Sequence, residues 1–390
     1  MQAIVNGELW TVSRGRIKGG TVLVDRGKIV AVGERVPLPE GTEIYEAGGR
    51  IVTPGIVDAH THLGISEEGI GFEGADYNER TDPVTPHLRA LDGINPEEMG
   101  LADAVEGGVT ACTVAPGSAN VVGGQVVAIK TRGTVVDRMV LRQPAGLKVA
   151  FGENPKRVYH EQKKSPVTRM ATAGLLRKVL ADARNYLEKR TASAGSPGDG
   201  EGQVARDLGL EAVAGVLEHR YPLRAHAHRA DDILTAIRVA EEFGVDLVIE
   251  HATEGHKIAS ELAERGIPAA VGPLLTSRSK YELRERSLAT PRVLYEAGVK
   301  FALITDHPVV PIQFLPLCAG LAVREGLPEE AAFRAITLSA AEIMGVADRV
   351  GSLEAGKDAD LVVWSGNPLE VRSYPVSVWC DGELAFRRDV

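Results

Sequence analysis

Residues 52–62 read VTPGIVDAHTH, an apolar run that ends in two histidines. Such a run is typical of a buried β-strand, and the spacing of His60 and His62 would place both imidazoles on the same face of that strand. Two neutral imidazoles side by side can bind one divalent metal ion. A histidine pair in the core or on the surface would give the same short motif, so its interpretation depends on the rest of the chain.

Further strand-like runs follow this one and alternate with helical stretches. The runs lie at residues 56–62, 108–114, 146–153, 222–228, 245–252, 267–272 and 299–307, and residues 126–131 supply an eighth. Helical stretches at residues 231–243, 258–265 and 329–344 fall between or after them. Alternation of this kind predicts an α/β fold with a parallel sheet, either a (β/α)8 TIM barrel or a doubly wound sheet.

The two ends of the chain have a different sequence pattern. Residues 1–50 contain short apolar runs separated by Asn-Gly and Arg-Gly turn signals, and the tail repeats this pattern with an Asp-Gly pair at residues 381–382. Such patterns are typical of antiparallel strands joined by tight turns. We therefore predict one small β-sandwich domain built from residues 1–52 and 346–390, and a barrel domain at residues 53–345.

Composition excludes several classes of protein. The chain has 390 residues and a formal net charge of −9, without a concentrated basic run, which argues against nucleic-acid binding. No apolar run approaches the roughly 20 residues that span a bilayer, and the first residues do not resemble a signal peptide. The three cysteines form no CxxC pair, which favours buried thiols in a reducing compartment. We expect a cytoplasmic protein that acts on a small molecule without membrane contact, and the sequence leaves a homo-oligomer open.

Chemistry-bearing residues recur at the ends of the predicted strands. His226, His251 and Asp306 each end an apolar run, as His60 and His62 do. Four of the ten histidines in the chain therefore occupy such positions, which makes coincidence a poor explanation. Because barrel active sites are assembled from the carboxyl ends of several strands, the pattern predicts a metal site at the barrel mouth.

These motifs resemble the metal-dependent amidohydrolase superfamily, and within it the imidazolonepropionase-related branch. The resemblance rests on VTPGIVDAHTH, the strand-end His226 and His251, TDHP around Asp306, and the closing segment GSLEAGKDADLVVWSGNPLE at residues 351–370. It covers nearly the whole chain and implies a (β/α)8 barrel with a terminal β domain. It further implies that His60, His62, His226 and His251 are metal ligands. Asp306 would touch the metal and accept a proton from the attacking water.

A further metal contact has two candidates. Family members use either a carboxylated lysine or a glutamate at the bridging position, which makes Lys148 and Glu153 the candidates here. Both fall on the predicted strand at residues 146–153, five positions apart, so they would face opposite sides. We favour Glu153, because it lies nearer the carboxyl end and resembles the strand-end glutamate of the superfamily's acetylamino-sugar deacetylases. Lys148 would then be a solvated side chain near the barrel bottom.

Three residues are candidates for substrate contact. His228 shares the face of His226, so we expect it to bind substrate and polarise the reacting oxygen, or to act as a ligand itself. Asn120 precedes the glycines of VVGGQ at residues 121–125, and Arg89 lies in the polar stretch after the first strand. Each of the last two could also be an ordinary loop residue.

The predicted activity is hydrolysis of a C–N bond in an amide or cyclic amide by a metal-activated water. Zinc is the expected ion, one or two per site, with Mn or Fe as alternatives because they share imidazole and carboxylate ligands. A dipeptidase or a heterocycle deaminase could use the same site. The deaminase is disfavoured because residues 226–229 read HAHR and lack the HxxE arrangement of those relatives. A non-catalytic assembly protein is the alternative from another class, although such relatives typically lose metal ligands.

Overall fold

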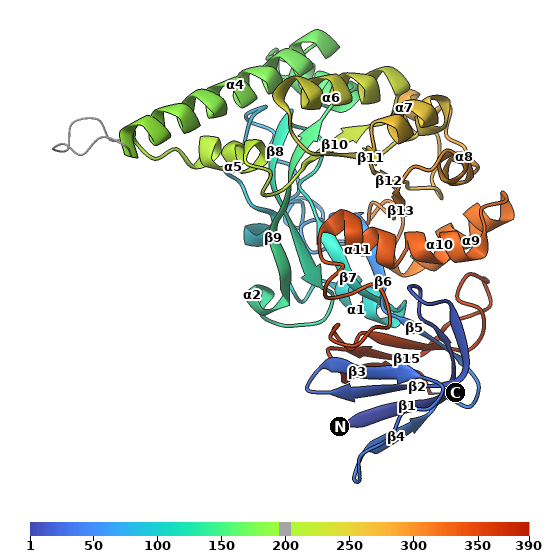
Figure 1. Cartoon of the computed structure of the whole chain (residues 1–390). Coiled ribbons are helices and arrows are strands. Elements are labelled where there is room, and N and C mark those ends of the chain that lie inside the picture. The colour runs from blue at the N-terminus through green and yellow to red at the C-terminus, as the bar shows by residue number, and fades with distance from the viewer. Residues whose placement is uncertain (195–203, 390) are drawn as a thin grey trace.

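The computed structural model describes residues 1–194 and 204–389 and contains two eight-stranded sheets (Figure 1). One sheet runs in chain order from β6 to β13, so that each strand is hydrogen-bonded to the next. Its strands are β6 (Ile56–Thr61), β7 (Val109–Val114), β8 (Val122–Lys130), β9 (Val140–Ala150), β10 (Leu223–Ala227), β11 (Leu247–His251), β12 (Ala269–Val271) and β13 (Phe301–Leu303). The predicted α/β barrel is therefore confirmed.

Backbone hydrogen bonds bring the first and last strands together just beyond their carboxyl ends. The His62 amide donates to the His307 carbonyl at 2.9 Å, and the Asp306 amide donates to the His60 carbonyl at 3.2 Å. Residues from the two extremes of the barrel sequence thus meet at its mouth.

Strand β8 departs from the expected parallel arrangement. It contains most of the predicted run at residues 126–131, but it pairs antiparallel with both β7 and β9. The link from β7 to β8 covers only residues 115–121. A parallel neighbour would need a crossover of about a dozen residues or more, so the short link requires the chain to reverse.

Helices lie around this sheet, and the long α4 and α6 lie side by side (Figure 1). They are α1 (Met99–Glu106), α2 (Val136–Met139), α3 (Glu153–Glu161), α4 (Arg169–Ala194), α5 (Leu208–Leu217), α6 (Ala230–Phe243), α7 (Ala259–Glu264), α8 (Thr290–Glu296), α9 (Leu315–Arg324), α10 (Glu329–Ala335) and α11 (Leu338–Met344). Helix α6 matches its prediction; it carries Asp231 and Asp232 in its first turn, and Gly244, with φ 64°, caps its carboxyl end. In the described part of the chain, no helix combines the length and apolar character needed to cross a bilayer.

The single helix predicted at residues 329–344 is two helices. Helix α10 ends before Ile336, and Thr337 has the non-helical dihedrals φ −138° and ψ −98°. The Ile336 carbonyl accepts a 2.8 Å hydrogen bond from the Val57 amide. The break therefore allows the helical segment to bond the start of β6.

Small side chains fill the lower part of the barrel. A buried cluster combines strand residues with residues of α11, which packs against β6 and β13. Its strand members are Val57, Ala59, Ala111, Val126, Ala128, Ala145, Val248, Ala270 and Ala302. The many alanines leave room in the barrel for a few long side chains that reach the site from below.

The second sheet joins both ends of the chain, as predicted, and Figure 1 shows the two termini within it. Its strands are β1 (Gln2–Trp10), β2 (Arg16–Asp25), β3 (Lys28–Gly33), β4 (Glu43–Glu46), β5 (Ile51–Pro54), β14 (Leu361–Trp364), β15 (Pro375–Cys380) and β16 (Glu383–Arg387). They form one hydrogen-bonded sheet whose buried core includes Leu9 and Val22 from the start of the chain and Leu361 and Trp379 from its end. The boundaries at residues 1–52, 53–345 and 346–390 stay predictions.

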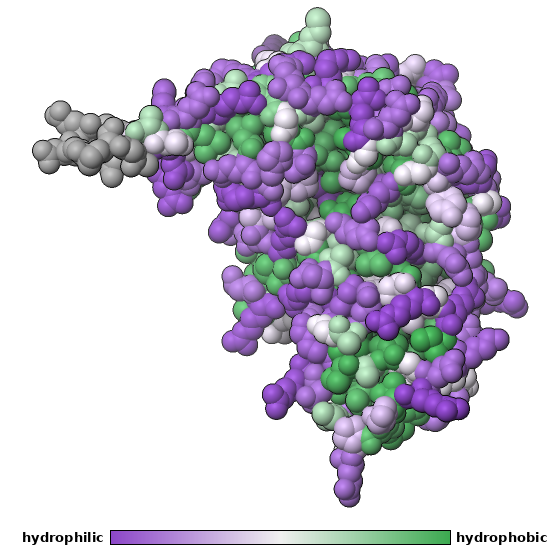
Figure 2. Space-filling model, in the orientation of Figure 1, coloured by the Kyte–Doolittle hydropathy of each residue, from purple (hydrophilic) through white to green (hydrophobic). Residues whose placement is uncertain are grey.

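Some apolar side chains of the terminal sheet remain exposed. Figure 2 shows hydrophobic residues gathered on its visible face, beneath a largely hydrophilic barrel surface. Val30, Ile44 and Leu384 are exposed members of this sheet.

Candidate metal centre

Six side chains named from the sequence meet at the carboxyl ends of four barrel strands. His60 and His62 come from the end of β6, His226 and His228 from the end of β10, His251 from the last position of β11, and Asp306 from the turn after β13. Two groups of three could each hold a metal ion, with ligand atoms within 4.8 Å of one another: His226, His228 and His251, and His60, His251 and Asp306. Both groups contain His251.

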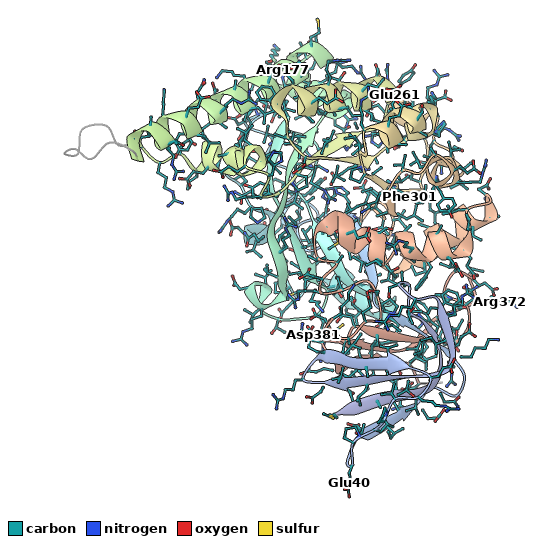
Figure 3. The ribbon with its side chains drawn as sticks, in the orientation of Figure 1. Glu40, Arg177, Glu261, Phe301, Arg372 and Asp381 are labelled. Carbon is teal, nitrogen blue, oxygen red and sulfur yellow. The ribbon has the colours of Figure 1, made fainter. Side chains whose placement is uncertain are left out.

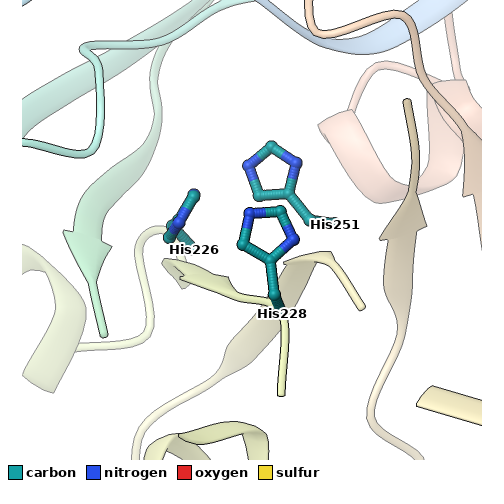
Figure 4. A group of neighbouring side chains, drawn as sticks. All are labelled: His226, His228 and His251. Carbon is teal, nitrogen blue, oxygen red and sulfur yellow. The ribbon is translucent and has the colours of Figure 1, made fainter. Parts of the chain in front are cut away.

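The first group is compact (Figure 4). The ring centre of His251 lies 4.5 Å from that of His226 and 4.8 Å from that of His228. In the second group, Asp306 Oδ1 lies 3.3 Å from His60 Nε2, and the neighbouring His62 Nε2 lies 3.4 Å from the same oxygen. The site is therefore one continuous cluster around His251 and Asp306.

Four of the histidines have an oxygen atom close to the same ring nitrogen, Nδ1, and three of them are hydrogen-bonded through it. His62 Nδ1 donates to the Ala115 carbonyl at 2.7 Å, and His251 Nδ1 donates to the Gly272 carbonyl at 3.0 Å. His228 Nδ1 is hydrogen-bonded to the Thr253 hydroxyl at 2.7 Å, and His60 Nδ1 lies 3.0 Å from a carboxylate oxygen of Glu250. A neutral imidazole with its proton on Nδ1 keeps its lone pair on Nε2, which is how second-shell oxygens prepare histidines for metal binding.

His226 is oriented differently. Its Nε2 lies 3.3 Å from Asn154 Nδ2, and that amide also donates to the Ser118 hydroxyl at 2.9 Å. Its Nδ1 is buried without a hydrogen-bond partner among the described residues. A buried polar atom without a partner is costly, and a metal ion at this cluster would give it one.

Protonation states in the cluster suit a cation. Burial lowers the pKa of His226 and His228 well below the ordinary value, and it lowers the pKa of His251 to about 3. Burial raises the pKa of Asp306, but the neighbouring histidines outweigh this effect and hold that pKa well below its usual range. Metal ligation requires neutral imidazoles and an ionised carboxylate. The donor set therefore fits a divalent metal ion.

Two of these residues occupy the left-handed region of backbone conformation. His251 has φ 73°, followed by Ala252 with φ 45°, and Asp306 has φ 55°. Residues other than glycine rarely adopt this backbone conformation, and those that do are often found at functional sites. Here the bends redirect the chain at the strand ends toward the cluster.

The prediction of a solvated Lys148 was wrong. Lys148 is only 1% exposed and lies on β9 beside Arg224 of β10. Its ammonium pairs with the carboxylate of Glu250, which is completely buried and also accepts a 2.9 Å hydrogen bond from Arg224 Nε. Lys148 therefore belongs to the layer of charges directly below the histidines.

Glu250 is a residue that sequence reasoning missed. Regular alternation along β11 would point Glu250 and His251 to opposite faces, so no sequence signal placed both beside His60. The left-handed conformation of His251 breaks this alternation at the strand end. Burial lowers the pKa of His60 most strongly, but the charge of Glu250, together with the close carboxylate contacts of Asp306 and Glu250, raises that pKa overall.

Glu153 does not lie on the strand where it was predicted. Strand β9 ends at Ala150, and Gly152, with φ 84°, turns the chain so that Glu153 begins α3. Its carboxylate accepts a 3.3 Å hydrogen bond from the Glu282 amide. The two ligand groups found among the described residues do not include it, and its role as a ligand stays a prediction.

The other predicted substrate contacts lie in different surroundings. The Asn120 amide group donates to the Thr85 hydroxyl at 2.9 Å, and its oxygen accepts from Tyr159 at 2.6 Å. Arg89 pairs with Asp92 and lines a separate cavity of about 900 Å³ with Tyr186. Of the three candidates, the structure places only His228 in the histidine cluster.

Lys280 was not anticipated. It lies in the segment after β12, with its Nζ 3.4 Å from Asn154 Oδ1 and 3.6 Å from Glu282 Oε2. Asn154 also contacts His226, so the Asn154 side chain links the Lys280 ammonium to the histidine cluster. A basic residue in a polar stretch of sequence carries no signal of such a position.

Known proteins resemble the chain over nearly its full length. A crystal structure of an amidohydrolase from Thermotoga maritima MSB8 is 48% identical, covers 100% of both chains and superposes with a TM-score of 0.95. An imidazolonepropionase from Polaromonas sp. is 28% identical over 391 residues, covering 90% of this chain and 84% of that protein. Amidohydrolase tasK from Hapsidospora irregularis is 33% identical over 394 residues, which cover 94% of this chain but only 40% of that longer protein.

A prolidase crystallised with N-methylphosphonate-L-proline shares the fold, with a TM-score of 0.64 at 20% identity and with 99% of this chain and 100% of that chain covered. The sequence model of the Amidohydrolase family matches residues 51–385, a range that includes all six residues of the cluster. The chain belongs to the amidohydrolase family, in the branch related to imidazolonepropionases, and is a hydrolase of that metal-dependent family.

Proposed function

We propose that this hydrolase cleaves a C–N bond in a small amide or cyclic amide. The observation that carries the proposal is the position of His251, which belongs to both groups of ligand atoms and joins the histidines of β10 to His60 and Asp306. One centre thus combines imidazole nitrogens with an ionised carboxylate that lies beside them. This combination suits attack by water on a carbonyl or amidine carbon.

A divalent ion held by His60, His62, His226, His251 and Asp306 would lower the pKa of water to about 7 and polarise the scissile carbonyl. We propose zinc for this ion, because imidazole and carboxylate ligands with an open position are typical of catalytic zinc sites. Mn and Fe accept the same ligands. Metal content of the purified protein identifies the ion and the number bound per chain.

Asp306 is proposed as the proton carrier. Its carboxylate is ionised and lies beside His60 and His62, so it accepts a proton from the attacking water and donates it to the leaving nitrogen. His228 is proposed to donate a hydrogen bond from Nε2 to the substrate oxygen, while its Nδ1 accepts one from the Thr253 hydroxyl. The two residues would act on opposite ends of the breaking bond.

The predicted ligand Glu153 has a direct test. If its carboxylate contacts the ion, Glu153→Gln loses metal, and added bicarbonate does not restore it. If the carboxylate serves only the Glu282 amide, the metal content of the variant equals that of the wild type.

The function is tested with metal-reconstituted enzyme on three panels of compounds: N-acyl amino acids and cyclic amides, dipeptides, and amino-substituted heterocycles. Turnover in the first panel that requires added metal supports the proposal. Turnover confined to dipeptides or to heterocyclic amines would instead identify a dipeptidase or a deaminase. Protein that holds no metal after reconstitution would indicate a non-catalytic member of the family.

A further inference from the structure

A layer of buried charges lies directly below the histidine cluster. Its members are Lys148 on β9, Arg224 on β10 and Glu250 on β11, and each is at most 1% exposed. In the strand register, Arg224 lies opposite Lys148, and Glu250 lies opposite His226. The layer therefore crosses three neighbouring strands immediately beneath the candidate ligands.

Glu250 connects this layer to the cluster. Its Oε1 lies 3.0 Å from His60 Nδ1 and 2.9 Å from Arg224 Nε, while its Oε2 pairs with the Lys148 ammonium. Arg224 also donates to the Ala59 and Ile343 carbonyls, so its guanidinium is held by the backbone on both sides. Glu250 is thus fixed between two cations, with His60 as its remaining partner.

An isolated buried carboxylate would be expensive, because burial removes its hydration. Here the cations Lys148 and Arg224 flank the anion Glu250. The layer has a net charge of +1 when His60 is neutral. Each charge is stabilised by the others. Even so, replacing such a buried group with hydrophobic residues of similar volume often leaves a protein equally or more stable. The contact with His60 supplies a reason for a carboxylate at this position.

We propose that Glu250 is a positioning residue, which holds the proton of His60 on Nδ1 and directs the Nε2 lone pair of His60 into the metal centre. Lys148 and Arg224 are its counter-charges. Lys148 then acts as an ammonium below the site and does not touch the metal. The inference rests on the proposed metal site and adds the residue that orients His60, one of its proposed ligands.

The test uses variants that separate charge balance from the contact with His60. Lys148→Met removes one counter-charge and leaves the carboxylate beside His60. Lys148→Met/Glu250→Met removes the hydrogen-bond acceptor and keeps the net charge of the layer at +1. Lys148→Met/Glu250→Gln keeps the net charge and an acceptor oxygen, and is the conservative rescue variant.

Zn²⁺ affinity is measured by competition with a chelator, and Co²⁺-substituted protein reports ligand geometry through its visible absorption. We expect Lys148→Met to bind one ion per chain nearly as tightly as the wild type. Lys148→Met/Glu250→Met should bind 10- to 100-fold more weakly and show an altered Co²⁺ spectrum, as loss of an outer-shell partner does. The Gln variant should recover part of the affinity. Should the Met double variant fail to fold, the comparison of the Gln variant with Lys148→Met decides.

Equal affinity and identical spectra in Lys148→Met and both double variants would overturn the positioning role. Loss of the ion in Lys148→Met alone would overturn it as well, because Lys148 would then be a ligand. If the wild-type protein binds no metal, the proposed function itself fails, and the inference fails with it. Those results are distinguishable, since the first two require a wild-type protein that binds metal.

Discussion

The Thr305 hydroxyl donates a 2.5 Å hydrogen bond to Asp58 Oδ2, although 247 residues separate the two in the chain. The Thr305 amide donates to the same oxygen at 3.2 Å, and Asp58 Oδ1 accepts from the His60 amide at 3.2 Å. Asp58 precedes His60 by two positions, and Thr305 directly precedes Asp306. One buried carboxyl group therefore ties together the two backbone segments that carry His60 and Asp306.

Replacing Thr305 with valine should weaken this tie. The variant keeps the shape of the side chain but removes one hydrogen-bond donor from a completely buried carboxyl group. We expect a loss of about 1–3 kcal/mol in the free energy of unfolding, measured by denaturant titration. Thr305→Ser keeps the hydroxyl and is the control. A loss in Thr305→Val no larger than that in Thr305→Ser would show that the hydrogen bond contributes no more than the methyl group that serine lacks.

Asp306→Asn should retain most of the bound metal but lose turnover. The amide remains beside His60 and His62, but it cannot accept a proton from water. We expect kcat to fall by about 10²- to 10⁴-fold, measured on the substrate found in the screen. Turnover at the wild-type rate would reduce Asp306 to a ligand or a structural residue.

His251→Asn should lose the metal, because both groups of ligand atoms depend on this imidazole. The expected drop in Zn²⁺ affinity exceeds the roughly 10- to 100-fold effect of outer-shell changes. His256→Asn is a matched control, because the His256 ring is hydrogen-bonded to the Thr290 hydroxyl and lies outside both groups. Similar affinities in the two variants would contradict the assignment of His251.

Lys130→Met should destabilise the protein strongly. The Lys130 ammonium at the end of β8 lies within 3.0 Å of carboxylate oxygens of Asp358, Asp360 and Asp381. Figure 3 places Asp381 where the terminal sheet meets the barrel, so this cation joins the two parts of the fold. Removing it leaves the buried Asp358 and Asp360 without this partner, at a cost of about 3–5 kcal/mol.

The control for this prediction is Lys178→Met. Lys178 pairs with Asp182 on the surface of α4, with side-chain exposures of 70% and 45%. An exposed pair of this kind contributes about 0.3–0.5 kcal/mol, so the melting temperature should hardly change. A loss of stability in Lys130→Met as small as that in Lys178→Met would contradict the stabilising role of the cluster around Lys130.

Local sequence determined the elements that recur along the chain. Apolar runs ending in His60, His226 and His251 encode strands whose carboxyl ends carry candidate ligands, because side-chain direction within one strand follows from its alternation. The turn signals near both termini likewise identified strands that a single β domain would need. Each of these strands and turns can therefore be predicted from the residues of its own short segment.

Tertiary structure decided what depends on contacts between segments. A short link made β8 antiparallel, and a break at Thr337 freed the Ile336 carbonyl for Val57. Lys148 is buried because Glu250 of another strand neutralises it, and Glu250 faces His60 because His251 leaves the regular strand conformation. No local pattern encodes such pairings, since a buried charge is stable only beside a partner that the folded chain brings to it.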